Sequence, residues 1–172
     1  MAASEAVMES SPALSRTTGM SGDIAARITA FLDTHHVMSL ATCGPHAANL
    51  FYARDGLSLL WVSDPQTRHS VALESNPHVS ATVAPDYRDF DEIRGVQISG
   101  DAHRIADASE RARARGLLEA RYPFLQRLSD RPHVKQAYES AELYRLVPRE
   151  IVIIDNTRGF GHKDTLDCRA FE

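Results

Sequence analysis

The sequence has little cysteine and no long apolar segment. Its 172 residues include two cysteines, Cys43 and Cys168, whose wide spacing suits neither a metal knuckle nor a redox pair, so we expect two reduced thiols. No run approaches the roughly 20 apolar residues of a membrane span. The N-terminus lacks the basic and apolar regions of a signal peptide. These absences predict a cytoplasmic protein that does not contact a membrane.

An excess of basic residues is also missing. Asp and Glu outnumber Lys and Arg by 23 to 19, which gives a formal net charge of −4. Nucleic-acid-binding domains usually present a basic face, so we expect no nucleic-acid partner.

Motifs of familiar chemistries are absent as well. Eight histidines are present, but none falls in an H-E-x-x-H or Cys/His ligand pattern, so no metal site is predicted. The sequence has no G-x-S-x-G elbow, and no G-x-G-x-x-G follows the first expected strand. A hydrolytic triad and a Rossmann nucleotide site are therefore not expected, and no catalytic residue can be named.

Short apolar runs separated by turn residues make up most of the chain. Residues 1–20 are small and polar, which predicts a disordered tail, and residues 21–172 are predicted to form one domain. We expect strands at 37–43, 46–53, 57–62, 79–84, 93–105 and 142–154, and helices near 23–36, 67–75, 109–121 and 133–140. This order favours a mainly β fold with helices (α+β), built on an antiparallel barrel of six strands.

Two local features refine this prediction. Gly95 and Gly100 interrupt a long alternating strand, which indicates bulges or bends of the kind that close a small barrel. Asp55-Gly56 predicts a hairpin that pairs strand 46–53 with the strand from Leu57.

The tail from Asn156 is expected to lie outside the core because it is polar and glycine-rich.

The stretch from Leu57 to Pro77 is the strongest candidate for a binding site. An apolar strand runs into Ser63-Asp64-Pro65, and Thr67 stands at the N-cap position of a short helix. Arg68 and His69 occupy the first helical turn, where acids are normally favoured. Two potential cations there suit a bound phosphate, although exposed surface residues are the other interpretation.

Three more residues carry open alternatives. Asn49 and Gln97 are amides in apolar strands, where a buried amide needs partners such as the polar edge of a heterocycle. For Asn49, pairing with backbone at a strand irregularity is the alternative. Trp61 suits a stacking surface, but a lone Trp in an apolar strand is more often part of the core.

These residues carry a family resemblance. The stretch W-V-S-D-P-Q-T-R-H (61–69), followed by N-P-H-V-S (76–80), resembles the flavin-binding split barrel of the pyridoxamine 5'-phosphate oxidase superfamily. The motifs I-R-G-V-Q (93–97) and D-N-T-R-G-F-G-H-K (155–163) are similar to those of small bacterial proteins within it. Together the likeness spans about residues 21–165.

The resemblance implies a six-stranded split barrel of the FMN-binding type, a homodimer with FMN at the interface, and a small-molecule substrate. Arg68 and His69, helped by Thr67, would hold the phosphate. The residues implied elsewhere around the cofactor are Val62 and Ser63 at the strand end, Ala48, Asn49, Leu50, Phe51 and Tyr52 beneath the isoalloxazine, and Gln97 of the opposite subunit. The tail around Phe160 and Lys163 would cover the substrate pocket.

Some positions depart from the true oxidase. His69 stands where the oxidase has Lys, Gly95 stands where it has Gln, and its C-terminal Trp and Arg-x-His elements are absent. We therefore expect an FMN-dependent oxidoreductase with a substrate other than pyridoxamine phosphate. The alternatives are a non-catalytic flavin binder and a haem-handling protein in which His162 ligates iron.

Overall fold

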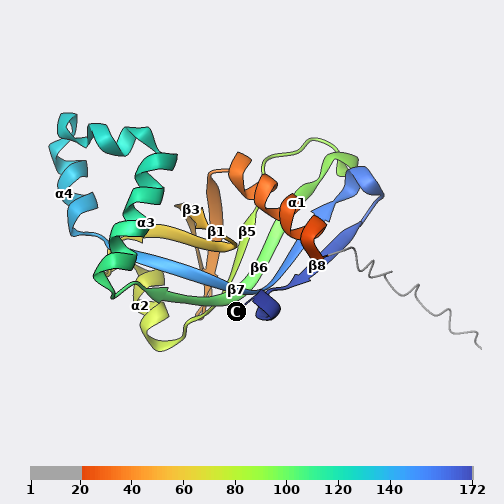
Figure 1. Cartoon of the computed structure of the whole chain (residues 1–172), viewed down its shortest axis with the longest axis horizontal. Coiled ribbons are helices and arrows are strands. Elements are labelled where there is room, and N and C mark those ends of the chain that lie inside the picture. Colours follow the sequence, from red (N-terminus) through yellow and green to blue (C-terminus); the bar gives the residue numbers. More distant parts are fainter. Residues whose placement is uncertain (1–20, 172) are drawn as a thin grey trace, which may run out of the picture.

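An antiparallel sheet curled into a half-open barrel forms the centre of the computed structural model, which describes residues 21–171 (Figure 1). The sheet order is β2-β1-β5-β6-β7-β4-β3, with β8 attached to β7. The strands are β1 (Val37–Thr42), β2 (His46–Phe51), β3 (Ala53–Asp55), β4 (Ser58–Ser63), β5 (His78–Val83), β6 (Arg94–Arg104), β7 (Glu142–Asp155) and β8 (Lys163–Asp167).

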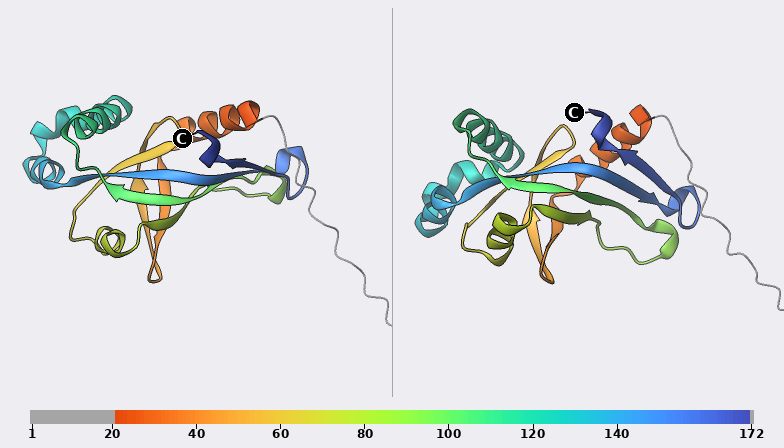
Figure 2. Two further views of the ribbon diagram at one scale, coloured as in Figure 1. Left: turned by 60° about the horizontal axis from the view of Figure 1, so that its bottom comes forward. Right: turned by 90° about the horizontal axis from the view of Figure 1, so that it is seen from below.

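The pair β6–β7 is the spine of the sheet and runs the length of the molecule (Figure 2). On its other side β7 pairs first with β4 and then with β8. The ladder shifts register where Ser99 faces Glu150 but Gly100 faces Pro148, so Arg149 is the extra residue of a bulge. A Cβ on Gly100 would lie 2.2 Å from the carbonyl oxygen of Val147, so only glycine fits there.

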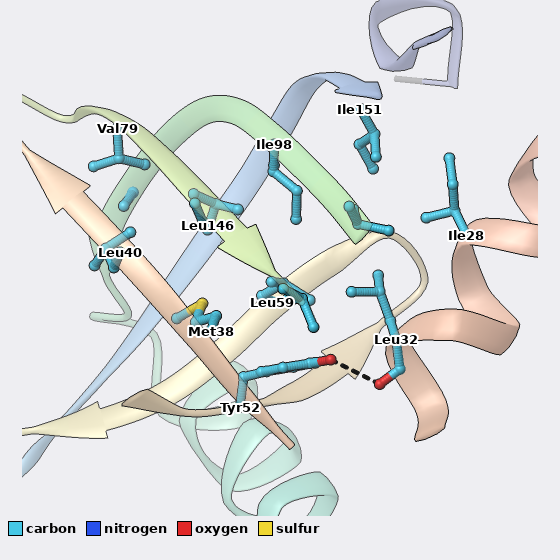
Figure 3. Packing of buried hydrophobic residues seen from close by; sticks show 14 of the residues in the cluster. Ile28, Leu32, Met38, Leu40, Tyr52, Leu59, Val79, Ile98, Leu146 and Ile151 are labelled. Atoms are coloured by element: carbon cyan, nitrogen blue, oxygen red, sulfur yellow. Dashed lines mark hydrogen bonds between the residues drawn. The ribbon is translucent and has the colours of Figure 1, made fainter. Parts of the chain in front are cut away.

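Helix α1 (Ser21–Thr34) covers one open end of the curled sheet. It buries Ile24, Ile28, Phe31 and Leu32 against the barrel interior, each stabilising the fold by about 1.5–3 kcal/mol. The hydroxyl of the fully buried Tyr52 donates to the carbonyl oxygen of Leu32 at 2.8 Å, which ties the sheet to the end of the helix (Figure 3).

A helical lobe lies at the opposite end of the sheet (Figure 1). It consists of α3 (Ala108–Arg121), η2 (Pro123–Asp130) and α4 (Pro132–Ser140). Ala114, Leu118 and Tyr122 pack against Leu60 and Leu143 in a second, smaller apolar cluster. The remaining helices are α2 (Arg68–Ser75), η1 (Phe90–Glu92), η3 (Asn156–Arg158) and η4 (Cys168–Phe171).

The predicted antiparallel split barrel is confirmed, but the strand count differs from six. The expected strand 46–53 divides at Tyr52, whose amide donates to the carbonyl of His36 instead of continuing a ladder. Asp55-Gly56 does form a hairpin, with φ +62° at Gly56, but it joins β3 to β4, while β2 pairs with β1.

The prediction that the tail from Asn156 lies outside the core is confirmed for residues 159–163 but is wrong for the residues that follow. Residues Lys163–Asp167 form β8, and Leu166 and Cys168 are buried in the main core. Single alternating apolar residues supply that core, and they give too weak a pattern to stand out beside the polar glycine-rich turn that precedes them. Trp61 is fully buried and stacks on Tyr144, so it belongs to the core.

Replacing Gly100 with Ala should lower the free energy of unfolding by at least about 2 kcal/mol, because the added methyl would overlap the β7 backbone. Gly116→Ala is the matched control, since Gly116 lies in helix α3 with nothing within 4 Å of the added methyl. The control should be neutral or stabilise by about 0.5–1 kcal/mol. Urea denaturation measures both, and equal effects would contradict the close approach.

Candidate functional site at the start of α2

Thr67 shapes the turn between β4 and α2. It is the N-cap residue, with φ −66° and ψ 152°, and its hydroxyl accepts from the Ser70 amide at 3.4 Å. The preceding turn is closed by the Asp64 carboxylate, which accepts from the Gln66 amide at 2.7 Å. By helix geometry the amides of Arg68 and His69 have no acceptor within the helix, so they are available to an anion.

His69 is buried at the centre of a hydroxyl network. It is 6% exposed, and its Nε2 lies 2.7 Å from Ser63 Oγ and 3.1 Å from Thr67 Oγ1. Burial and then the neighbouring His46 lower the pKa of His69, which favours the neutral imidazole. The side chain therefore holds the two hydroxyl groups in place and is not an exposed cation beside Arg68.

Arg68 faces an open groove of about 470 Å³ between α2 and the β1–β2 turn. Its side chain is exposed, and among the described residues that line the groove it is the only Lys or Arg. The lining residues are Thr42, Cys43, Gly44, Pro45, His46, Gln66, Arg68, Val71, Ala72 and Ser75.

Strand β2 begins beside this groove and forms one edge of the sheet. Side chains alternate along it: Ala48 and Leu50 are half-buried, while Asn49 and Phe51 are exposed. Its outer backbone edge pairs with no other described strand, so it can offer amide and carbonyl groups to a flat ligand. Tyr52, by contrast, is fully buried, and its carbonyl lies 2.6 Å from the Tyr122 hydroxyl.

The expectation that Asn49 is a buried amide is wrong for the described chain. The strand register places it on the outer face opposite Ser39, whose hydroxyl donates to Asn49 Oδ1 at 2.7 Å. Gln97 lies on the same face and is also exposed. The Asn49 side chain is therefore bonded neither to backbone nor inside the core. No helix or strand within residues 21–171 covers this face of the sheet.

The other sequence candidates fall in two separate places, the end of β4 and the turn between β7 and β8. Val62 is half-buried and packs on the smaller core cluster, whereas Ser63 is buried in the His69 network. Phe160 is 79% exposed in the β7–β8 turn, and Lys163 is exposed at the start of β8. Figure 1 shows that turn at the end of the molecule away from α2.

Sequence reasoning missed His46. Its ring lies parallel to that of His69, with the centroids 6.2 Å apart and the planes inclined by 5°. The two residues meet because the first turn of α2 lies beside the start of β2. The sequence held a weak signal, since His46 is the first residue of the strand that was assigned to the flavin.

The comparisons identify the family. The family model for pyridoxamine 5'-phosphate oxidase matches residues 24–145. The chain belongs to the pyridoxamine 5'-phosphate oxidase family. A UPF0306 protein of Photorhabdus laumondii is 30% identical over 138 residues, which cover 77% of this chain and 88% of that protein.

Solved structures share the fold of this pyridoxamine 5'-phosphate oxidase family member. A haem-binding protein from Mycobacterium smegmatis superposes with a TM-score of 0.67 at 20% identity, covering 90% of this chain and 61% of that one. An FAD-binding protein from Mesorhizobium loti gives a TM-score of 0.57 at 19% identity, covering 74% and 89%.

Between residues 21 and 171, no helix has both the length and the apolar character needed to span a membrane. Within the same range, no three His, Cys, Asp or Glu side chains are grouped so that they could hold a metal ion.

The buried neutral His69 predicts a pH dependence of stability. The unfolded chain protonates His69 as the pH falls through about 6.5, whereas the folded chain resists because its pKa is lowered. The free energy of unfolding should therefore fall as the pH drops below about 6.5.

Chemical denaturation across that pH range tests this, with His69→Gln expected to reduce the fall. His103→Gln, which alters an exposed histidine of β6, serves as the control and should keep the full fall. Identical pH profiles for the wild type and His69→Gln would contradict the neutral buried imidazole.

Proposed function

We propose that this protein binds FMN, with the phosphate at the start of α2 and the ring system along the edge of β2. The observation that carries the proposal is the exposed Arg68 in a groove beside the Thr67-capped helix turn, where an anion can meet a guanidinium and two backbone amides. The family membership supports flavin as the ligand.

The residues present fit such a phosphate, but with less charge than a pair of cations would give. Arg68 supplies the formal charge, and Thr67 supplies a hydroxyl at the N-cap. His69 contributes by fixing Ser63 and Thr67, since its imidazole is buried and neutral. This arrangement predicts a lower affinity for FMN than two cations at the phosphate would give. Retention of FMN then depends on contacts in the rest of the site.

The rest of the site includes a second copy of the chain. The outer face of the sheet carries rows of small or polar side chains in register, among them Asn49, Ser39, Thr82 and Gln97 on β2, β1, β5 and β6. A shallow groove of about 320 Å³ crosses this face beside Gln97. Packing two such faces together would bring Gln97 of one copy toward the β2 edge of the other, as a homodimer with FMN between the subunits requires.

The reaction we propose is oxidation or reduction of a small molecule. Bound FMN supplies hydride or single-electron transfer, and the protein sets access to it. The departures at His69 and Gly95 argue against pyridoxamine phosphate as the substrate. A flavin binder without turnover is the simpler form of the same proposal.

A haem-handling function is the second candidate. It is favoured by the haem-binding protein that superposes with a TM-score of 0.67. His162, the ligand considered from the sequence, lies 3.0 Å through Nε2 from the buried carboxylate of Asp164, so iron ligation through that nitrogen would have to break this contact.

The first test is the absorbance spectrum of the purified protein, with mass spectrometry of whatever denaturation releases. We expect the visible bands of flavin and the mass of FMN. If purification removes the FMN, the spectrum is measured after an excess of FMN has been added. A Soret band with released haem would support the second candidate. Bleaching by NADH or NADPH with turnover on an added acceptor would separate an enzyme from a binder.

Arg68→Ala should weaken FMN affinity at least about tenfold, because a charge-assisted contact to the phosphate is lost. Titration of the apoprotein with FMN, followed by flavin fluorescence, measures the change. Arg104→Ala removes an exposed arginine of β6 and should leave the affinity unaltered. Equal affinities for wild type and Arg68→Ala would remove Arg68 from the site.

Thr82→Arg should convert the protein from a dimer to a monomer, since it puts a charge at the centre of the outer sheet face. Light scattering should give twice the chain mass of 19.0 kDa for the wild type and a single chain mass for the variant. Ala112→Arg, on the exposed side of α3, is the control and should stay dimeric. A monomeric wild type would contradict the shared site.

A further inference from the structure

A second groove, of about 550 Å³, lies at the other end of the molecule from α2. It opens between α1 and the adjoining ends of β6 and β7. Its lining combines an apolar part with charged and polar groups from three elements: Arg27, Ala30, Phe31, Thr34, His35, Arg94, Ile153, Ile154 and Asp155. This size and mixture suit a small organic ligand.

Two sequence motifs, residues 93–97 and 155–163, meet beside this groove. The Asn156 amide donates to the carbonyl of Ile93 at 2.9 Å, and its Nδ2 donates to the carbonyl of Phe90 at 2.6 Å. Asp155 pairs with Arg94 in the β6–β7 register. These contacts join residues 93–97 to residues 155–163, and Arg94 and Asp155 from the two segments line one wall of the groove.

An ion cluster around the buried Asp164 holds Arg27, which lines the groove from α1. Asp164 is 3% exposed, and its Oδ2 lies 2.5 Å from Arg27 Nη1, 3.0 Å from His162 Nε2 and 3.5 Å from Arg158 Nη1. Burial alone would raise the pKa of Asp164, but hydrogen bonds from Arg27 and His162 outweigh it and hold the pKa below its ordinary value. Asp164 is therefore a carboxylate that anchors the Arg27 guanidinium.

That anchoring leaves one side of Arg27 with an unmet donor. Nη2 is buried and has no hydrogen-bond acceptor in the described chain; the Asp155 carboxylate is 3.8 Å from it. Buried donors are normally satisfied by protein or water, so the Arg27 guanidinium keeps hydrogen-bonding capacity beyond its contact with Asp164. Arg94 lines the same groove, is exposed, and makes no ion pair with the residues the structure describes.

We propose that this groove binds an organic monoanion, a carboxylate on an apolar body. The carboxylate would bind Arg94 on the side of the groove where Arg27 adds positive charge, and the apolar body would lie over Phe31 and Ile153. The charged residues that line the groove are Arg27, Arg94 and Asp155, and their net positive charge favours a single negative charge on the ligand. The site belongs to this chain's own groove and holds whether or not FMN binds at α2.

Benzoate tests the proposal as a probe, since it joins a carboxylate to a flat apolar ring. Binding to the full-length protein is measured by ligand-observed NMR and calorimetry at fixed ionic strength, with benzyl alcohol as the neutral probe of the same shape. We expect benzoate to bind and benzyl alcohol to bind at least about tenfold more weakly.

Variants then locate the binding. Arg94→Gln should weaken benzoate at least about tenfold, whereas Arg94→Lys, which keeps the charge, should recover part of that loss. Arg104→Gln and Arg68→Ala should leave benzoate affinity unchanged, and the latter separates this groove from the α2 site. Arg94 is exposed, so its variants should fold, which circular dichroism verifies.

Four results would overturn the proposal. Three of them are no detectable benzoate binding to the wild type at millimolar concentration, equal binding of benzyl alcohol, and an unchanged affinity in Arg94→Gln. A loss caused equally by Arg68→Ala would move the anion to the α2 groove and also count against this one.

Discussion

The contact between the neutral His69 imidazole and the hydroxyls of Ser63 and Thr67 is the constraint on which the candidate flavin site depends. Ser63 is the last residue of β4, and Thr67 is the cap of α2, so one buried ring fixes the angle between strand and helix. These hydrogen bonds hold the first turn of α2 in place beside the groove. A lysine at position 69 would add charge but could not join these two hydroxyls in the same way.

The open side of the barrel supplies the second element of the site. The central pair β6–β7 carries the rest of the sheet, and β7 takes β4 and β8 along its other edge. Strand β2 and the end of β4 therefore come near one another without pairing, which leaves an unpaired backbone edge beside the α2 groove. A protein that closed this side with a ladder would have no edge to offer a flat ligand.

The two ends of the molecule carry different chemistry. At α2 the groove presents one arginine, hydroxyl groups and amides, which suit a phosphate. Under α1 a larger groove presents Arg27, which the buried Asp164 carboxylate holds, and the exposed Arg94 beside apolar side chains. Residues 93–97 and 155–163 meet at the second end, away from the phosphate groove.

Much of the fold could be predicted from the sequence because its strands alternate and its turns carry Gly, Pro and Asp. The glycine-dependent irregularity at Gly100 and the Thr67 cap followed from local chemistry alone. Strand β8 could not be predicted, because its apolar contribution to the core is Leu166 alone, in a polar surrounding.

Site details depended on long-range contacts that no local pattern contains. His69 looks like an exposed cation in the sequence, yet tertiary packing buries it beside His46. Asn49 looks buried within its apolar strand, yet the register turns it to the outer face. The Arg27–Asp164 contact joins residues 137 positions apart, so its role in shaping a groove appears only in three dimensions.

The most direct measurement of the central claim compares FMN with riboflavin, which lacks the phosphate, by titration of the same apoprotein. A phosphate held at the start of α2 predicts that FMN binds at least about tenfold more tightly than riboflavin, and that Arg68→Ala removes most of the difference. Equal affinities for the two flavins in the wild-type protein would contradict the assignment of the phosphate to α2.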